Sequence, residues 1–116
     1  MRGIEGEQTL LRIFVGQAKK PLRRPLYREI LDLVRAEGLA GATVLKGVAG
    51  FGRGRRVHSA NIEGLFESLP LVLEVVDTEE RLQRLLPKIE ALMSGGSVTL
   101  ERARVIRYSP AAPPSA

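Results

Sequence analysis

The sequence contains no cysteine, and this absence excludes disulfide bonds, thiol catalysis and metal sites built on thiolates. Histidine is almost absent as well, because His58 is the only one, and this disfavours a metal site built on a histidine cluster. No apolar run approaches the roughly 18 residues of a membrane-spanning helix, and residues 1–10 lack the apolar core of a signal peptide. These absences predict a cytoplasmic protein.

Aromatic residues are also scarce, at 4% of the chain, and they form no evenly spaced platform. Stacking on single-stranded nucleic acid needs such a platform. The paired aromatic residues on central strands that many RNA-binding modules carry are absent too. A nucleic-acid-binding module is therefore an alternative that the charge favours and the aromatic pattern disfavours.

The charge of the chain is strongly basic, with 18 Lys and Arg against 13 Asp and Glu and a pI of about 10.2. Such a balance favours anionic partners: a nucleotide, a nucleic acid or an acidic protein surface. Two stretches contain no acid, and their basic residues lie mainly in predicted loops; solvated surface charge is the alternative explanation. The first stretch contains Arg12, Lys19, Lys20, Arg23, Arg24 and Arg28, and the second contains Lys46, Arg53, Arg55, Arg56 and His58.

The first half of the chain has the pattern of a strand, a helix and a strand. Residues 9–15 alternate, which puts Leu11, Ile13 and Val15 on one face of a strand. A helix can start at Pro25, and Gly38 suits its C-cap. The core stripe of that helix is Leu26, Ile30, Leu33 and Val34. Residues 42–48 predict the second strand.

The second half repeats this order after a glycine-containing segment without clear periodicity, residues 49–69. Residues 71–76 form an apolar run interrupted by Glu74, which is typical of a central strand. Asp77 and Glu80 suggest an N-cap with its capping-box partner, and Pro87 should kink or loosen the helix that follows. Its apolar stripe is Leu82, Leu85, Leu86, Ile89 and Leu92. Gly95 and Gly96 end it, and residues 98–106 predict the fourth strand.

Two β-α-β units with right-handed crossovers predict an α+β fold, a ferredoxin-like βαββαβ sandwich. Its four-stranded antiparallel sheet would carry both helices on one face. The other face would then be left with side chains such as Leu10 and Phe14, which would invite an oligomer partner. Residues 49–69 would form a long loop, mobile without a ligand and anchored at its far end by Leu65, Phe66 and Leu69.

Three stretches resemble the PII signal-transduction family. They are Gly38-Leu-Ala-Gly-Ala-Thr-Val44 with the following Gly50-Phe-Gly-Arg53, Leu69-Pro-Leu-Val-Leu-Glu-Val-Val76, and Ala103-Arg-Val-Ile-Arg107. The chain resembles an uncharacterised PII-like branch, a domain of unknown function, more closely still. The stretches that carry this resemblance are Gly6-Glu-Gln-Thr-Leu-Leu-Arg-Ile-Phe14, Pro25-Leu-Tyr27 and residues 38–47. We therefore expect one PII-like domain over residues 1–108, with its long loop at about 49–69, and a disordered tail over residues 109–116.

The resemblance implies a homotrimer with three clefts between subunits, a signalling or regulatory role, and no enzymatic activity. It implies that an adenine nucleotide (AMP, ADP or ATP) or a similar anion is the effector in these clefts. It also implies that the long loop reaches a partner protein, with a membrane transporter or channel as a candidate class. The residue-by-residue match to the family, together with the loop chemistry described below, implies six nucleotide-binding residues: Thr43, Gly50, Gly52, Arg53, Arg56 and Arg107.

The sequence departs from the PII pattern in three places. Only Ser94, Gly95, Gly96 and Ser97 stand where PII proteins have a longer loop with a Lys that clamps phosphate. Ser109 replaces a second Arg after the last strand, and the long loop has no Tyr that could be uridylylated. These departures indicate weaker nucleotide binding or a less charged ligand.

The run from Gly50 to Gly54 suits an anion nest, because glycines expose backbone N–H groups, and the neighbouring arginines add forked donors. It is not a P-loop, since no Gly-Lys-Ser/Thr occurs and no helix starts there. The alternative is a flexible loop whose glycines allow a sharp exit from the second strand. A small acylphosphatase-like enzyme is a further alternative, for which Arg53 and Asn61 are the only loop candidates.

Overall fold

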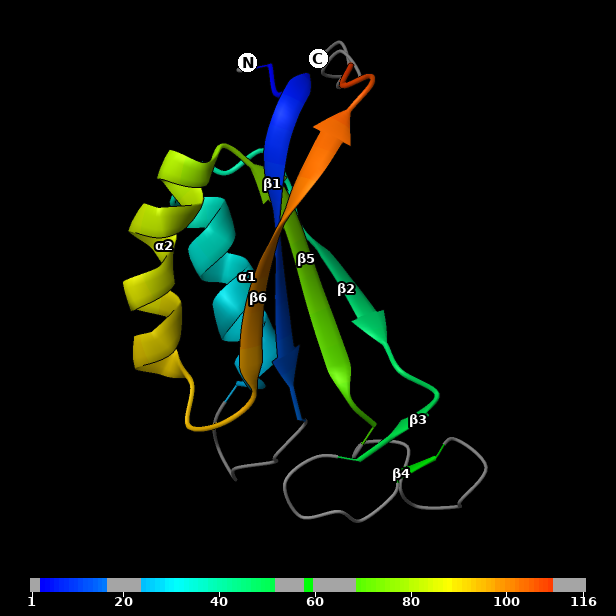
Figure 1. Ribbon diagram of the computed structural model, residues 1–116. Helices are drawn as coiled ribbons and strands as arrows, with labels where there is room; N and C mark the ends of the chain where they lie inside the picture. The colour runs from blue at the N-terminus through cyan, green and yellow to red at the C-terminus, as the bar shows by residue number, and fades with distance from the viewer. Residues whose placement is uncertain (1–2, 17–23, 52–57, 60–68, 110–116) are drawn as a thin grey trace, which may run out of the picture.

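The structure, a computed structural model, describes residues 3–16, 24–51, 58–59 and 69–109. Figure 1 shows the elements that these residues form, with the two termini at one end of the molecule. In chain order they are β1 (Gly6–Val15), α1 (Leu26–Ala36), β2 (Thr43–Lys46), β3 (Ala49–Gly50), β4 (His58–Ser59), β5 (Leu71–Asp77), α2 (Glu79–Leu92) and β6 (Ser97–Val105).

Four strands form one antiparallel sheet in the order β2-β5-β1-β6, and β3 and β4 form a separate two-stranded ribbon. Both helices cover the same face of the four-stranded sheet (Figure 1). This is the βαββαβ arrangement that the sequence predicts, and the α+β fold is confirmed. β5 and β1 are central, while β2 and β6 are the edges.

The core lies between the sheet and the two helices. Alternate residues of β1 and β5 point into it, as the period of two in residues 9–15 predicts. Every third or fourth residue of each helix packs against these strand residues from the helix layer. Its buried side chains, each at most 4% exposed, are Leu11, Ile13, Val15, Ile30, Val34, Leu71, Leu73, Val75, Leu82, Leu85 and Ile89.

The helix ends agree with the sequence in α1 and differ in α2. Pro25 directly precedes α1, and Gly38 follows its C-terminal end with a φ of 76°. The N-cap of α2 is Thr78 and not Asp77, because the Thr78 Oγ1 accepts the N–H of Arg81. Asp77 is instead the last residue of β5. α2 continues through Pro87 as one helix.

The region after β2 differs from the sequence-based expectation in two respects. The second strand ends at Lys46 rather than residue 48, and Val48 is 76% exposed. The following segment has regular structure in β3 and β4, where no clear period predicted any. The N–H of Gly47 bonds the carbonyl of Pro70 at 2.8 Å, and a Cβ on Gly47 would lie 2.9 Å from the Pro70 ring. The chain thus still runs beside Pro70 where it leaves the sheet.

Other parts of that segment lie outside the described residues, including Leu65, Phe66 and the predicted mobility of the loop. Leu69, the third predicted anchor of its far end, is buried at 1% exposure. Residues 110–116 of the predicted tail also lie outside the described part.

The turn into β6 requires glycine at one position. Gly96 has a φ of 99°, and a Cβ there would lie 2.2 Å from the carbonyl oxygen of Phe14. Both facts exclude a side chain without a shift of the backbone. Gly95 next to it has open space around its Cα, so the two glycines that the sequence places together have different roles.

Candidate functional site

Three of the six predicted nucleotide-binding residues are described. Thr43 is the exposed first residue of β2, where it stands opposite Glu74 of β5. Gly50 lies in β3, and a Cβ there would lie 3.1 Å from the Pro70 ring. Arg107 is exposed and follows the end of β6. The other three, Gly52, Arg53 and Arg56, lie outside the described residues, as does Asn61.

Gly50 and Arg107 lie at opposite ends of the sheet (Figure 1). β6 begins beside Phe14, near the end where the chain leaves for β3, and ends beside Gly6 at the other end. β6 has nine residues, and at about 3.3 Å per residue its ends are roughly 26 Å apart. A single chain therefore does not bring Gly50 and Arg107 to one small ligand.

A buried carboxylate holds the segment that leads into Thr43. Asp77 is fully buried, and its Oδ2 accepts the N–H of Ala40 at 2.8 Å while its Oδ1 accepts the N–H of Thr78 at 2.7 Å. The Tyr108 hydroxyl donates to the carbonyl of Ala40 at 3.3 Å. Asp77 thus connects the start of α2 to the segment between α1 and β2. Tyr108 connects the residues that follow β6 to the same segment.

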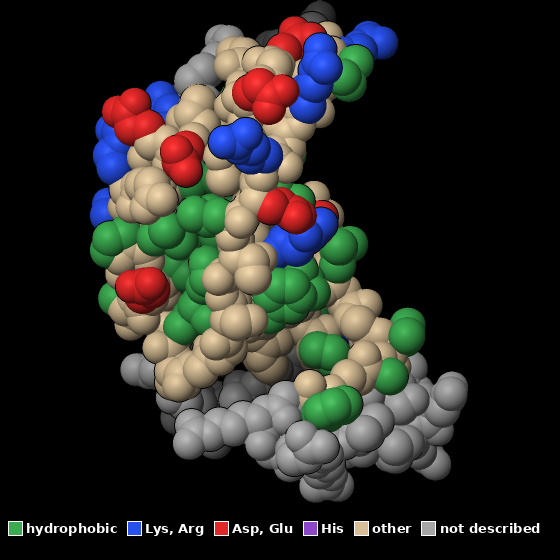
Figure 2. All heavy atoms as spheres, viewed as in Figure 1, with side chains coloured by type: hydrophobic (Ala, Val, Ile, Leu, Met, Phe, Trp, Pro, Cys, Tyr) green, Lys and Arg blue, Asp and Glu red, His purple; other side chains and the backbone are tan. Residues whose placement is uncertain are grey.

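The face of the sheet opposite the helices is apolar around a charged centre; we call it the outer face. Its strand residues alternate with the core residues, and its large apolar side chains are Leu10, Phe14, Leu45, Val72 and Val76. By the same alternation, its charged strand residues are Arg12, Glu74 and Glu101. The view of Figure 2 takes in α2 as well as the sheet; hydrophobic side chains gather in its middle and lower part, and most charged side chains lie in its upper half.

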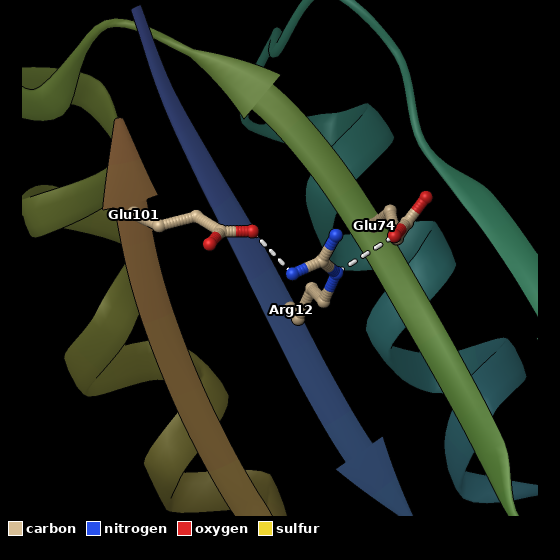
Figure 3. A network of polar contacts seen from close by, with 3 residues as sticks. All are labelled: Arg12, Glu74 and Glu101. Carbon is tan, nitrogen blue, oxygen red and sulfur yellow. Dashed lines mark hydrogen bonds and ion pairs between the residues drawn. The ribbon is translucent and has the colours of Figure 1, made fainter. Parts of the chain in front are cut away.

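Arg12 of β1 lies between the two glutamates of the neighbouring strands (Figure 3). Its Nε donates to Glu74 Oε2 at 2.8 Å, and its Nη1 donates to Glu101 Oε1. The bond to Glu74 raises the pKa of Arg12 above its ordinary value, against the desolvation that lowers it, and the charge of Glu101 adds to the increase. The side chains are 36%, 30% and 53% exposed, so water reaches all three.

The positions of Arg12 and Glu74 within their strands indicate this network, although their residue types alone do not. Arg12 interrupts the apolar run of residues 10–15 and Glu74 that of residues 71–76, and each stands at an even position whose odd neighbours are buried. Opposite charges on the same face of two predicted strands are candidates for a cross-strand pair. The missing information is the register between strands that are 62 residues apart in the chain.

The first basic stretch is partly neutralised on α1. Asp32 forms an ion pair with Arg24 at 2.7 Å, and it has longer contacts with Arg35 at 3.7 Å and with Arg28 at 3.9 Å. All three arginines are at least half exposed at their side chains. Arg24 and Arg28 thus lie on a solvated surface beside Asp32, an acid that follows the stretch, as the alternative explanation of the charge predicts. Lys19, Lys20 and Arg23 lie outside the described residues.

One open hollow of about 500 Å³ lies where β1 begins, beside the N-terminus of α2 and the second half of β6. Its lining residues are Glu7, Gln8, Thr9, Thr78, Glu79 and Arg102. None of the predicted nucleotide-binding residues is among them. Among the described residues there is also no cluster of acidic and histidine side chains that would hold a metal ion, and no helix long and apolar enough to cross a bilayer.

A family model described as "Uncharacterized ACR", DUF190, matches residues 8–105, which is most of the chain. The chain belongs to the DUF190 family. Two UPF0166 proteins of Aquifex aeolicus (strain VF5) are 35% identical over 100 residues and 44% identical over 99 residues. The alignments cover 86% and 85% of this DUF190 chain and 94% and 97% of the relatives. A UPF0166 protein of Methanocaldococcus jannaschii is 33% identical over 99 residues, covering 84% of this chain and 91% of the relative.

Solved structures of PII-like proteins share the fold of this DUF190 chain. CPII, a nitrogen regulatory PII-like protein from Thiomonas intermedia K12, was solved bound to ADP, AMP and bicarbonate; it aligns with a TM-score of 0.60 at 20% identity, over 87% of this chain and 90% of its own. A PII-like signaling protein from Thermus thermophilus aligns with a TM-score of 0.64 at 17% identity, over 87% of this chain and 91% of its own. These likenesses confirm the PII-like fold that the sequence motifs indicate.

Proposed function

We propose that this DUF190 chain is a trimeric, non-enzymatic regulatory protein of the PII-like kind. It binds an adenine nucleotide or a similar anion in clefts between subunits and acts on a partner protein through residues 49–69. The observation that carries the proposal is the shared fold with CPII, which was solved with ADP, AMP and bicarbonate. The family membership and the PII-like motifs of the sequence support it.

The positions of the described candidates support a site between chains. Arg107 and Gly50 are separated by the length of β6, so they reach one ligand only if they come from different copies. Thr43 stands on the edge strand β2 and on the outer face, where a neighbouring copy has access. Arg107 has no ion-pair partner among the described residues, so its guanidinium is available to a phosphate.

The short turn between α2 and β6 limits the charge that the site can neutralise. Residues 93–96 join the helix to the strand directly, and Gly96 packs against the carbonyl of Phe14. The turn therefore has no room for the phosphate-clamping loop of PII proteins. We expect a monophosphate such as AMP, or ADP, to bind at least as well as ATP.

The partner would be a protein, with a membrane transporter or channel as the candidate class, and the proposed location is the cytoplasm. The basic charge of the second acid-free stretch suits an acidic surface on such a partner. The arginines of this stretch, which all stand in residues 49–69 and outside the described part, are Arg53, Arg55 and Arg56.

Titration calorimetry of the full chain with AMP, ADP, ATP and cyclic AMP tests this function. We expect heat from at least one nucleotide, and Arg107→Ala should weaken its affinity by roughly ten- to a hundredfold, because a charge-assisted hydrogen bond is worth about 1.5–3 kcal/mol. Arg104→Ala is the matched control, since it removes the same charge from the same strand end.

No heat from any of the four nucleotides at millimolar concentration would contradict nucleotide sensing. Equal losses in Arg107→Ala and Arg104→Ala would contradict a specific contact by Arg107 and point to general electrostatic attraction. Turnover of an acyl phosphate by the purified chain would contradict the non-enzymatic assignment.

A further inference from the structure

The open hollow at the start of β1 is a second candidate site, on the face of the sheet that the helices cover. Alternation along the strands places Glu7, Thr9 and Arg102 on this face, and Thr78 and Glu79 line the hollow from the N-terminal end of α2. Its volume of about 500 Å³ lies within the range of about 300–1,000 Å³ that is typical of small-molecule sites. None of the predicted nucleotide-binding residues lines it, so a ligand here is separate from the proposed nucleotide.

Thr9 is the most buried residue that lines the hollow. It is 9% exposed, and its hydroxyl makes no hydrogen bond within the described part of the chain. In the register Thr9 stands between Asp77 of β5 and Arg102 of β6, and the Asp77 carboxylate accepts the N–H groups of Ala40 and Thr78. Buried side-chain hydroxyls in proteins generally have a partner. A polar group of a ligand in the hollow would supply the one that Thr9 lacks.

Donors for a negative group surround this hydroxyl. Arg102 stands opposite Thr9 on the same face, and its guanidinium has no ion pair within the described ranges. Thr78 caps α2 through the N–H of Arg81, which leaves the first two N–H groups of the helix without an intrahelical acceptor. The helix N-terminus also carries a partial positive charge. A carboxylate bonds well to such a combination of guanidinium, hydroxyl and backbone N–H groups.

Carboxylates on the other part of the lining require a positive group as well. Glu7 and Glu79 line the hollow, are exposed and form no ion pair among the described residues. With Arg102 they give the lining a charge of +1 − 2 = −1, and the nearby Asp77 and Arg104 add −1 and +1, which cancel. A simple anion would be repelled by the two glutamates, and a simple cation would leave Arg102 without a partner. A ligand with both charges satisfies both parts of the lining.

We propose that this hollow binds a free α-amino acid. Its carboxylate bonds Arg102, the Thr9 hydroxyl and the start of α2, while its ammonium group lies against Glu7 and Glu79. The net charge of the lining favours a basic side chain, so L-lysine is the probe. The inference goes beyond the proposed function and does not depend on nucleotide binding.

Titration of the ¹⁵N-labelled full chain with L-lysine at pH 7.5, followed by NMR, tests the site. The backbone amides of Thr9, Glu79 and Arg102 should shift and saturate at millimolar ligand. Acetate alone and butylamine alone, which each carry one of the two charges, should bind roughly tenfold more weakly or less. Absence of saturable shifts at these amides with L-lysine would overturn the proposal, and so would equally strong binding of acetate or butylamine.

Two variants test the contacts. Arg102→Leu should weaken L-lysine binding roughly tenfold or more, because it removes the charged donor. Arg104→Leu is the matched control, since it removes the same charge from the same face of β6 but does not line the hollow. Equal losses in the two variants would show general electrostatic attraction and overturn a specific contact by Arg102.

Thr9→Val removes the hydroxyl and keeps the shape of the side chain. It should weaken L-lysine binding roughly two- to tenfold, and it should not lower the Tm of the free protein, because no hydrogen bond to a described residue is lost. A lower Tm without ligand would show that the hydroxyl already has a partner in the protein. That result, or unchanged affinity for L-lysine in Thr9→Val, would overturn the role of Thr9. Since ADP is titrated separately, loss of nucleotide binding and loss of amino-acid binding are distinguished.

Discussion

The two faces of the sheet are built from the same strands but meet different surroundings. On the helix face, Leu11, Ile13 and Leu73 are completely buried without any help from another chain. On the outer face, the residues between them, Arg12 and Phe14 among others, remain partly exposed. The first face belongs to the fold of one chain, whereas the second has apolar surface and hydrogen-bonding capacity left over.

This difference separates the residues that one chain buries by itself from those that it leaves partly exposed. A sheet face that only meets water would carry polar residues at most alternate positions. β5 instead has Val72 and Val76 on its outer face, so its alternation is between fully buried and half-buried residues. The single polar position between them, Glu74, is paired with Arg12. The outer face therefore carries apolar side chains around a polar centre.

The largest effect should come from the helix face. Leu73→Ala should lower the free energy of unfolding by about 2–5 kcal/mol at every protein concentration, because it opens a cavity in the core. Val72→Ala, one residue earlier on the outer face, should have a smaller effect that grows with protein concentration as copies associate. Urea denaturation at two concentrations measures both, and equal, concentration-independent losses would contradict the distinction between the faces.

The next effect concerns the carboxylate at the end of β5. Asp77→Ala should cost about 2–4 kcal/mol of stability, because the N–H groups of Ala40 and Thr78 lose a charged acceptor. Asp77→Asn keeps one oxygen and should lose about half as much. Hydrogen exchange should show the amide of Ala40 opening in both variants; unchanged protection there would mean that Asp77 does not hold this connection.

The smallest of these effects should come from the turn that enters β6. Gly96→Ala should cost about 1–3 kcal/mol, because its φ of 99° and its approach to Phe14 both exclude a Cβ. Gly95→Ala is the control and should leave the midpoint of thermal unfolding nearly unchanged. Because β6 carries Glu101, Gly96→Ala should also weaken association on the outer face. Equal shifts in Tm for Gly96→Ala and Gly95→Ala would contradict this account of the turn.

Much of the fold could be predicted from local patterns because those patterns report on single elements. The period of two in residues 9–15 indicates which side chains of β1 are buried, and Gly38, whose positive φ favours glycine, follows the end of α1. The β-α-β order then leaves few topologies. The PII-like motifs identified the family directly, and the family match confirms them.

The remaining features depend on residues that are distant in the chain. The carboxylate of Asp77 looked like a helix cap, but it also accepts the N–H of Ala40, 37 residues away, and Thr78 caps the helix instead. The Arg12 network requires the register of three strands. The proposed nucleotide site depends on a further level, because Gly50 and Arg107 would reach one ligand only from separate chains.

The measurement that tests the central claim most directly is a calorimetric titration of ADP into wild type and into Arg12→Leu. The variant is used at a concentration at which light scattering shows it to be monomeric and folded. If the nucleotide site is assembled between copies that meet on the outer face, the wild type should bind ADP and the monomeric variant should release no heat. Equal binding by both would show that one chain holds the whole site, and no binding by the wild type would remove ADP from the proposed function.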